Sequence, residues 1–308
     1  MNNMRAVSVR PLDDGAKGFV FVVVAGVLWA LVSPASRVLG GMGVDMVTVV
    51  TLRQAVAALV LVLVLGLWLF AFRRDSLRIN LKTAGAMALF ALTGPLAANL
   101  GFMMFLRTLS VPVGMVIHYT FPLLTALGAL WITKERPSLG EWLGGTMIIA
   151  GLSVAAGGTG SISTAGVMWG GISAIAMAVQ SLFGRKVSSG RSMTPVVLLF
   201  YSNALGVLWL LGGRWLFMGA PISPIPMEGI LWASFLGLAA SCLAYGLYFE
   251  GMKYVTASSA SLGVTVEIVA ATSMAAAMLG EFPSAREVVG CAMVMGAVVL
   301  AAFSRKGR

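Results

Sequence analysis

Apolar segments of about 20 residues recur along the whole chain, and this recurrence constrains the fold more than any single motif does. A helix of that length crosses the hydrocarbon core of a bilayer. Hydrophobic residues make up 59% of the 308 positions and charged residues only 10%, which is too little charge to cover a soluble surface. The sequence therefore predicts an all-α integral membrane protein with ten transmembrane helices. They are expected near 19–39, 46–71, 82–106, 112–132, 139–157, 165–187, 194–217, 226–250, 258–279 and 286–303.

The net charge of +10 is explained by topology rather than by nucleic acid. With the N-terminus inside the cell, 16 Lys and Arg residues fall in cytoplasmic segments and 4 on the opposite side, while Arg53 lies inside a span. Because cytoplasmic loops of membrane proteins carry the excess of basic residues, both termini are expected in the cytoplasm. No nucleic-acid partner is expected.

One ten-residue motif occurs twice, 146 positions apart. The first copy reads Glu135-Arg-Pro-Ser-Leu-Gly-Glu-Trp-Leu-Gly144, and the second reads Glu281-Phe-Pro-Ser-Ala-Arg-Glu-Val-Val-Gly290. Each copy opens the last apolar segment of its half, so the chain contains two five-span repeats. A repeat with an odd number of spans must insert its second copy upside down, which is an architecture of transporters.

The repeats give the expected organisation of the chain. A cytoplasmic N-terminal segment, 1–18, precedes the first repeat, 19–157. An extracytoplasmic linker, 158–165, leads to the second repeat, 166–303, and a cytoplasmic tail, 304–308, follows. A second correspondence supports the duplication, because Ala30-x-x-Ser33-x-x-x-Arg37 matches Ala178-x-x-Ser181-x-x-x-Arg185.

Two five-helix repeats that each carry a Glu-x-Pro-Ser-x-x-Glu-x-x-Gly motif resemble the EamA repeats of the drug/metabolite transporter superfamily. Within that superfamily the chain looks most like exporters of aromatic amino acids in bacterial inner membranes. The resemblance implies a ten-helix basket with a central substrate cavity that exports amino acids by alternating access. It implies a multi-pass protein of the bacterial inner (plasma) membrane, in contact with lipid and functional as a monomer.

The repeated motif itself has a structural explanation. Ser138-x-x-Glu141 and Ser284-x-x-Glu287 are capping boxes, in which side chains satisfy free N–H groups at a helix start. Pro137 and Pro283 disfavour helix at the residue before them. Glu135 and Glu281 remain without a partner that the sequence identifies.

Ionisable groups inside the bilayer are costly, and each is therefore a candidate for function. His118 is the only histidine of the sequence, and Glu267 is the only carboxylate near the middle of a span. The repeat alignment places the two at nearby levels of related helices, where they can relay protons or bind an ammonium group. Arg53 and Glu250 rank lower, because each can extend toward an interface.

Polar and aromatic residues on helical faces complete the predicted cavity, since such faces do not suit lipid tails. The cavity is expected near the midplane, enclosed by the first, third, fourth, sixth, eighth and ninth spans. Its expected substrate-binding residues are Trp29, Asn99, His118, Gln180, Tyr245, Tyr248 and Glu267. No catalytic residue, cofactor or metal is expected.

Other functional classes fit the sequence less well. One histidine excludes an HExxH zinc site, and the chain has no GxSxG motif, so an enzyme is not expected. A channel would need a ring of like charges or a carbonyl filter. Anionic substrates would require several cavity Arg or Lys residues, and only Arg53 is available. An exporter of lipophilic cationic drugs, with Glu267 as counter-ion, remains the alternative.

Cys242 and Cys291 lie within predicted spans, where we expect them to act as small residues that pack between helices.

Overall fold

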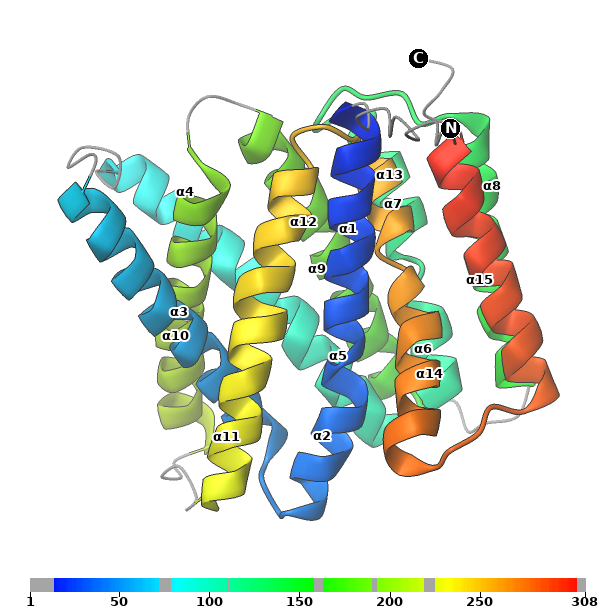
Figure 1. Cartoon of the computed structure of the whole chain (residues 1–308), viewed down its shortest axis with the longest axis horizontal. Helices are drawn as coiled ribbons and strands as arrows, with labels where there is room; N and C mark the ends of the chain where they lie inside the picture. Colours follow the sequence, from blue (N-terminus) through cyan, green and yellow to red (C-terminus); the bar gives the residue numbers. More distant parts are fainter. Residues whose placement is uncertain are drawn as a thin grey trace, which may run out of the picture.

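The computed structural model describes residues 14–71, 79–109, 111–157, 163–189, 193–218 and 225–303, and these residues form helices and no strand (Figure 1). Nine helical stretches in this described part are long and apolar enough to cross a membrane. A tenth, Val113–Ala129, is shorter but apolar. The predicted all-α membrane architecture is thereby confirmed.

The helices of the first repeat are α1 (Asp14–Ala30), α2 (Val32–Gly41), α3 (Met46–Ala71), α4 (Leu81–Ala91), η1 (Leu92–Leu96), α5 (Ala97–Thr108), α6 (Val111–His118), α7 (Phe121–Ala129) and α8 (Leu139–Ala156). Those of the second are α9 (Thr164–Ser189), α10 (Pro195–Met218), α11 (Met227–Leu236), η2 (Gly237–Ala244), α12 (Tyr245–Gly251), α13 (Ala257–Gly263), α14 (Val266–Leu279) and α15 (Ala285–Phe303). Of the predicted segments outside the repeats, residues 1–13, 158–162 and 304–308 lie outside the described part.

Several spans are interrupted, and the interruptions recur at equivalent places. The fourth span breaks at Tyr119–Thr120 between α6 and α7, and the ninth breaks at Val264–Thr265 between α13 and α14. These breaks coincide to within one residue under the 146-residue offset. The third and eighth spans each contain a π-helical segment, η1 and η2, also at matching positions. Broken helices of this kind occur in transporters where backbone lines a cavity.

The two repeats are inverted relative to each other. We call the end of the bundle where α1 begins and α15 ends the termini end, and the opposite end the far end; they lie at the top and bottom of Figure 1. The connection from α7 to α8 lies at the termini end, whereas the equivalent connection from α14 to α15 lies at the far end (Figure 1). The two copies of the Glu-x-Pro-Ser motif therefore occupy opposite ends of the bundle, as predicted.

The last helices of the repeats, α8 and α15, pack antiparallel against each other through small residues. A Cβ placed on Gly151 would lie 2.9 Å from the carbonyl oxygen of Gly290, and one placed on Gly144 would lie 3.3 Å from that of Ala297. The offset of 146 converts Gly144 into Gly290 and Gly151 into Ala297. The residue pairs Gly151–Gly290 and Ala297–Gly144 are thus equivalent by the internal symmetry, which places the pseudo-two-fold axis in this α8–α15 seam.

Both predicted capping boxes are present. The N–H of Ser138 donates to Oε2 of Glu141 at 2.6 Å, and the N–H of Glu141 donates to Oγ of Ser138 at 3.2 Å. The corresponding distances for Ser284 and Glu287 are 2.7 and 3.4 Å. These residues build the starts of α8 and α15.

Candidate functional site

A cavity of about 450 Å³ lies between the two repeats. Its inner part is lined by Trp29, His118 and Glu267 near the middle of the bundle, and it extends to Glu281 and Phe282 at the far end. Phe282 is exposed, so the cavity reaches the protein surface at that end. The volume is within the roughly 300–1,000 Å³ that is usual for small-molecule sites.

Five of the seven predicted site residues line this cavity. They are Trp29, Asn99, His118, Tyr245 and Glu267. The wall also includes residues of the second, fifth and tenth spans, which the prediction did not include: Arg53 of α3, Leu152 of α8 and Cys291 of α15. The cavity is thus enclosed by more helices than the sequence suggested.

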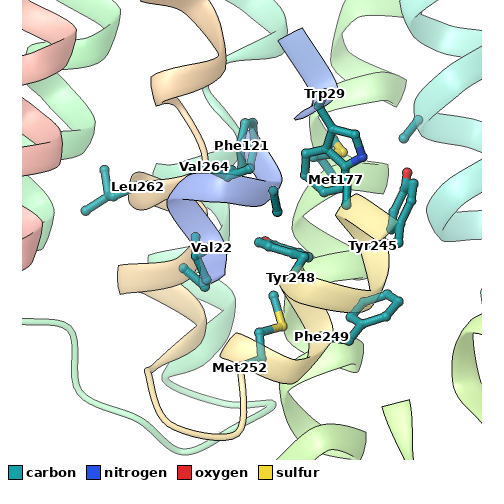
Figure 2. Packing of buried hydrophobic residues seen from close by; sticks show 14 of the residues in the cluster. Val22, Trp29, Phe121, Met177, Tyr245, Tyr248, Phe249, Met252, Leu262 and Val264 are labelled. Carbon is teal, nitrogen blue, oxygen red and sulfur yellow. The ribbon is translucent and has the colours of Figure 1, made fainter. Parts of the chain in front are cut away.

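The other two predicted residues, Gln180 and Tyr248, lie behind the cavity wall. Tyr248 is completely buried and packs against Trp29, with ring centroids 5.2 Å apart. Figure 2 shows it beside Trp29 and Tyr245, on the same helix as Tyr245. Gln180 is also completely buried and is within hydrogen-bonding reach of Tyr245. These two residues support the wall in this state of the protein.

Trp29 and Tyr245 form the aromatic part of the wall. Their rings meet edge to face, with centroids 4.7 Å apart, a favoured arrangement for aromatic pairs. The indole N–H of Trp29 donates to the carbonyl oxygen of Ala240 at 2.9 Å. Ala240 belongs to the π-helical η2, whose irregular backbone offers this acceptor. The ring of Trp29 is thereby fixed in orientation.

His118 is held in one tautomer by its neighbours. Its Nδ1 lies 2.9 Å from Oγ of Ser173, and that hydroxyl donates to the carbonyl oxygen of Ala98 at 2.8 Å. Because a hydroxyl has a single proton, Ser173 must accept from Nδ1–H of His118. In the neutral ring, Nε2 then carries a lone pair and can accept a hydrogen bond from an N–H group.

Glu267 lies in the first turn of α14, directly after the break in the ninth span. The partial positive charge of a helix N-terminus stabilises a carboxylate at this position. The hydroxyl of Tyr119, at the equivalent break in the fourth span, is within hydrogen-bonding reach of the carboxylate. The two interrupted helices thus place an acidic group and a phenol at the centre of the cavity.

Arg53 also lines the cavity, although its position in the span ranks it below His118 and Glu267 as a candidate. It does not extend to an interface, as its length would allow, because the residue is only 4% exposed and lines the cavity. Its Nε and Nη1 atoms are buried and have no hydrogen-bond partner among the described residues. Arg53 interacts electrostatically with Glu267 but does not form an ion pair with it. The cavity therefore presents a basic and an acidic side chain that are not joined in an ion pair.

Comparison with known proteins agrees with this architecture. The model of the EamA-like transporter family matches residues 16–157 and again residues 164–303. The chain is 26% identical over 204 residues to the uncharacterized transporter YwfM of Bacillus subtilis (strain 168), an alignment that covers 64% of this chain and 66% of that protein. A crystal structure superposes with a TM-score of 0.76 at 18% identity, covering 93% of this chain and 97% of the other, which shows a shared fold.

The repeats, the membrane-length helices and the central cavity define a multi-pass membrane transporter of small molecules. Since both halves match the family model, the chain belongs to the EamA-like transporter family.

Proposed function

We propose that this protein exports neutral amino acids, aromatic ones included, by alternating access through the cavity. One observation supports this substrate class above the others: Arg53 and Glu267 line the same cavity without forming an ion pair. A buried charge without a partner is costly, so a ligand that supplies both opposite charges is favoured. A zwitterionic amino acid has a carboxylate for Arg53 and an ammonium group for Glu267.

The uncharged part of the cavity suits the side chain of such a substrate. Trp29, Phe102 and Met177 offer apolar and aromatic surface, and Nε2 of His118 can accept a hydrogen bond from an indole N–H. Arg53 disfavours the alternative substrate class, lipophilic cationic drugs, because it places a positive charge in the cavity. The sequence also resembles the aromatic amino acid exporter YddG of bacterial inner membranes, and this resemblance favours the same class.

We further propose that the protein lies in the bacterial inner membrane with both termini in the cytoplasm, as the distribution of Lys and Arg suggests. The termini end is then the cytoplasmic end, and the cavity is open to the outside. A cavity in this state would release exported substrate.

The direct test is uptake of radiolabelled tryptophan, phenylalanine and threonine into proteoliposomes, with ethidium as the lipophilic cation. We expect transport of the amino acids and none of ethidium. Tryptamine, which lacks the carboxylate, and indole-3-propionate, which lacks the ammonium group, should each compete only weakly with tryptophan for transport. Transport of ethidium without transport of any amino acid would contradict the proposal.

Two substitutions assign the charges. Arg53→Gln should weaken tryptophan transport by roughly tenfold or more, through loss of a charge-assisted pair, and should make tryptamine a relatively better competitor. Glu267→Gln should weaken tryptophan transport in the same way and should make indole-3-propionate a relatively better competitor. Glu250→Gln is the matched control, because Glu250 pairs with Lys253 at 2.7 Å outside the cavity. Equal competition profiles in all three variants would show that these charges do not recognise the substrate.

A further inference from the structure

Two arginine–glutamate ion pairs connect the repeats, one at each end of the bundle. Arg185 of the second repeat pairs with Glu135 of the first, through Nε and Oε1 at 2.7 Å. Arg37 of the first repeat pairs with Glu281 of the second. The repeat alignment equates Arg37 with Arg185 and Glu135 with Glu281. Each pair is therefore the symmetry equivalent of the other.

The two pairs differ strongly in their surroundings. At the termini end the side chains of Arg185 and Glu135 are 19% and 15% exposed, whereas at the far end those of Arg37 and Glu281 are 48% and 51% exposed. The pair at the termini end is also tied to the backbone. Arg185 donates to the carbonyl oxygen of Met252, and Oε2 of Glu135 accepts from the N–H of Ala257 at 2.9 Å.

A second carboxylate of the first repeat reinforces the contact at the termini end. Glu141 is only 3% exposed. Its Oε1 lies 2.9 Å from the hydroxyl of Thr256 and 2.7 Å from that of Ser259, both at the start of α13. Glu135 and Glu141 together attach the start of α13 to the first repeat and close the termini end.

The equivalent residues at the far end do not form such a closed contact between the repeats. Glu281 and Glu287, which correspond to Glu135 and Glu141, are exposed and line the mouth of the cavity. Arg37 lines the same mouth. The protein thus has one inter-repeat contact that is largely shielded and one exposed version of it, and the cavity opens on the side of the exposed version.

We propose that the Arg185–Glu135 and Arg37–Glu281 pairs act as two latches, meaning ion pairs that form in turn and hold one end of the cavity closed while the other end is open. Closure of the far end would bury Arg37–Glu281 at the mouth, while Arg185–Glu135 separates and opens the termini end. The inference depends on transport through this cavity and not on which substrate it carries.

Two reporter cysteines can test this in purified, substrate-free protein. Cys291 lines the cavity near the far end and should react with a maleimide in the present state, in a Cys242→Ser background. Ser258→Cys, in a protein without Cys242 and Cys291, reports on the termini end. Ser258 is buried beside Ala257, and its Oγ has no partner among the described residues, so the substitution is mild.

Arg185→Gln should weaken the buried latch and shift the population toward the opposite state. We expect labelling of Cys291 to slow by roughly threefold or more and labelling of Ser258→Cys to accelerate. Arg37→Gln should neither slow the labelling of Cys291 nor accelerate the labelling of Ser258→Cys. Lys186→Gln and Arg286→Gln remove exposed charges from the same two ends and should leave both rates unchanged.

The opposite changes at the two reporters distinguish a latch from a merely stabilising contact. If Arg185→Gln accelerates labelling at both positions, the pair only holds the structure together and the proposal is overturned. The proposal is also overturned if neither labelling rate changes. If Arg185→Gln is not recovered folded, Arg185→Lys retains the charge but loses the forked geometry, and it should shift both rates in the same directions by less. No substrate is used, so failure of the amino acid proposal would leave this result intact.

Discussion

The hydroxyl of Tyr248 donates to Oγ of Ser181, 2.8 Å away, because that serine already donates its own proton to the carbonyl oxygen of Met177 at 2.9 Å. Tyr248 lies on α12 and Ser181 on α9, so this bond joins two helices beneath Trp29. It fixes the layer that supports the cavity wall rather than the wall itself.

Tyr248 should therefore affect transport through Trp29 and not through contact with substrate. Tyr248→Phe loses one hydrogen bond and should cost about 1 kcal/mol of unfolding free energy, with substrate preference unchanged. Tyr248→Ala leaves a cavity beneath Trp29 and should cost roughly 3–5 kcal/mol. Thermal unfolding in detergent, together with competition profiles, measures both. A change of preference in Tyr248→Phe would place its hydroxyl in the binding site.

The α8–α15 seam should not tolerate side chains at its closest points. A Cβ on Gly290 would lie 2.6 Å from the carbonyl oxygen of Gly151, and backbone cannot move away as a flexible side chain can. Gly290→Ala and Gly151→Ala should each destabilise the protein by about 1–3 kcal/mol. Gly171→Ala is the matched control, since a Cβ there meets nothing within 4 Å. Equal melting temperatures in all three variants would contradict the packing described here.

The two capping boxes should differ in strength. Ser138→Ala should cost about 1–2 kcal/mol, because its partner Glu141 is buried and also binds α13. Ser284→Ala should cost only about 0.5–1 kcal/mol, because its box is exposed and its Oγ is 3.4 Å from the N–H of Glu287. Neither substitution should change substrate preference. Unchanged stability with altered selectivity would show that these serines are not caps.

The orientation in the membrane can be tested outside the described residues. Ser76 and Ser161 lie in connections that the charge distribution assigns to opposite sides. Single cysteines at these positions should react differently with an impermeant reagent added to intact cells, with reaction at position 161 only. Reaction of position 76 from outside, with none at 161, would reverse the predicted topology.

The sequence predicted the architecture well because membrane spans and repeats are one-dimensional signals. Ten apolar segments and a motif at a 146-residue spacing suffice for an inverted ten-helix fold. The positions of the breaks at Tyr119–Thr120 and Val264–Thr265 were not predicted, although Pro122 in the first turn of α7 and Gly263 at the end of α13 lie beside them. The polar cavity groups next to them, Tyr119 and Glu267, show what the breaks achieve.

The site was harder to predict, because position in a span does not give depth in the bundle. Arg53 is seven residues after the start of α3, a place from which a long side chain can reach an interface, yet packing against η2 keeps it inside. Tyr248 shares a face with Tyr245 but lies one turn deeper. The partners of Glu135 and Glu281 could have been predicted from the sequence. The alignment that equates these two glutamates also equates Arg37 with Arg185.

The symmetry of the α8–α15 seam has a practical consequence. Exchange of the two repeats converts the contact of Gly151 with Gly290 into that of Ala297 with Gly144, so the seam is the same before and after. Unlike the two Arg–Glu pairs, which differ in exposure, both of these seam contacts are closely packed in the present state, so neither has to break when the protein changes state. A covalent cross-link between α8 and α15 should therefore leave turnover intact, which makes these two helices a fixed reference frame for measuring how every other helix moves.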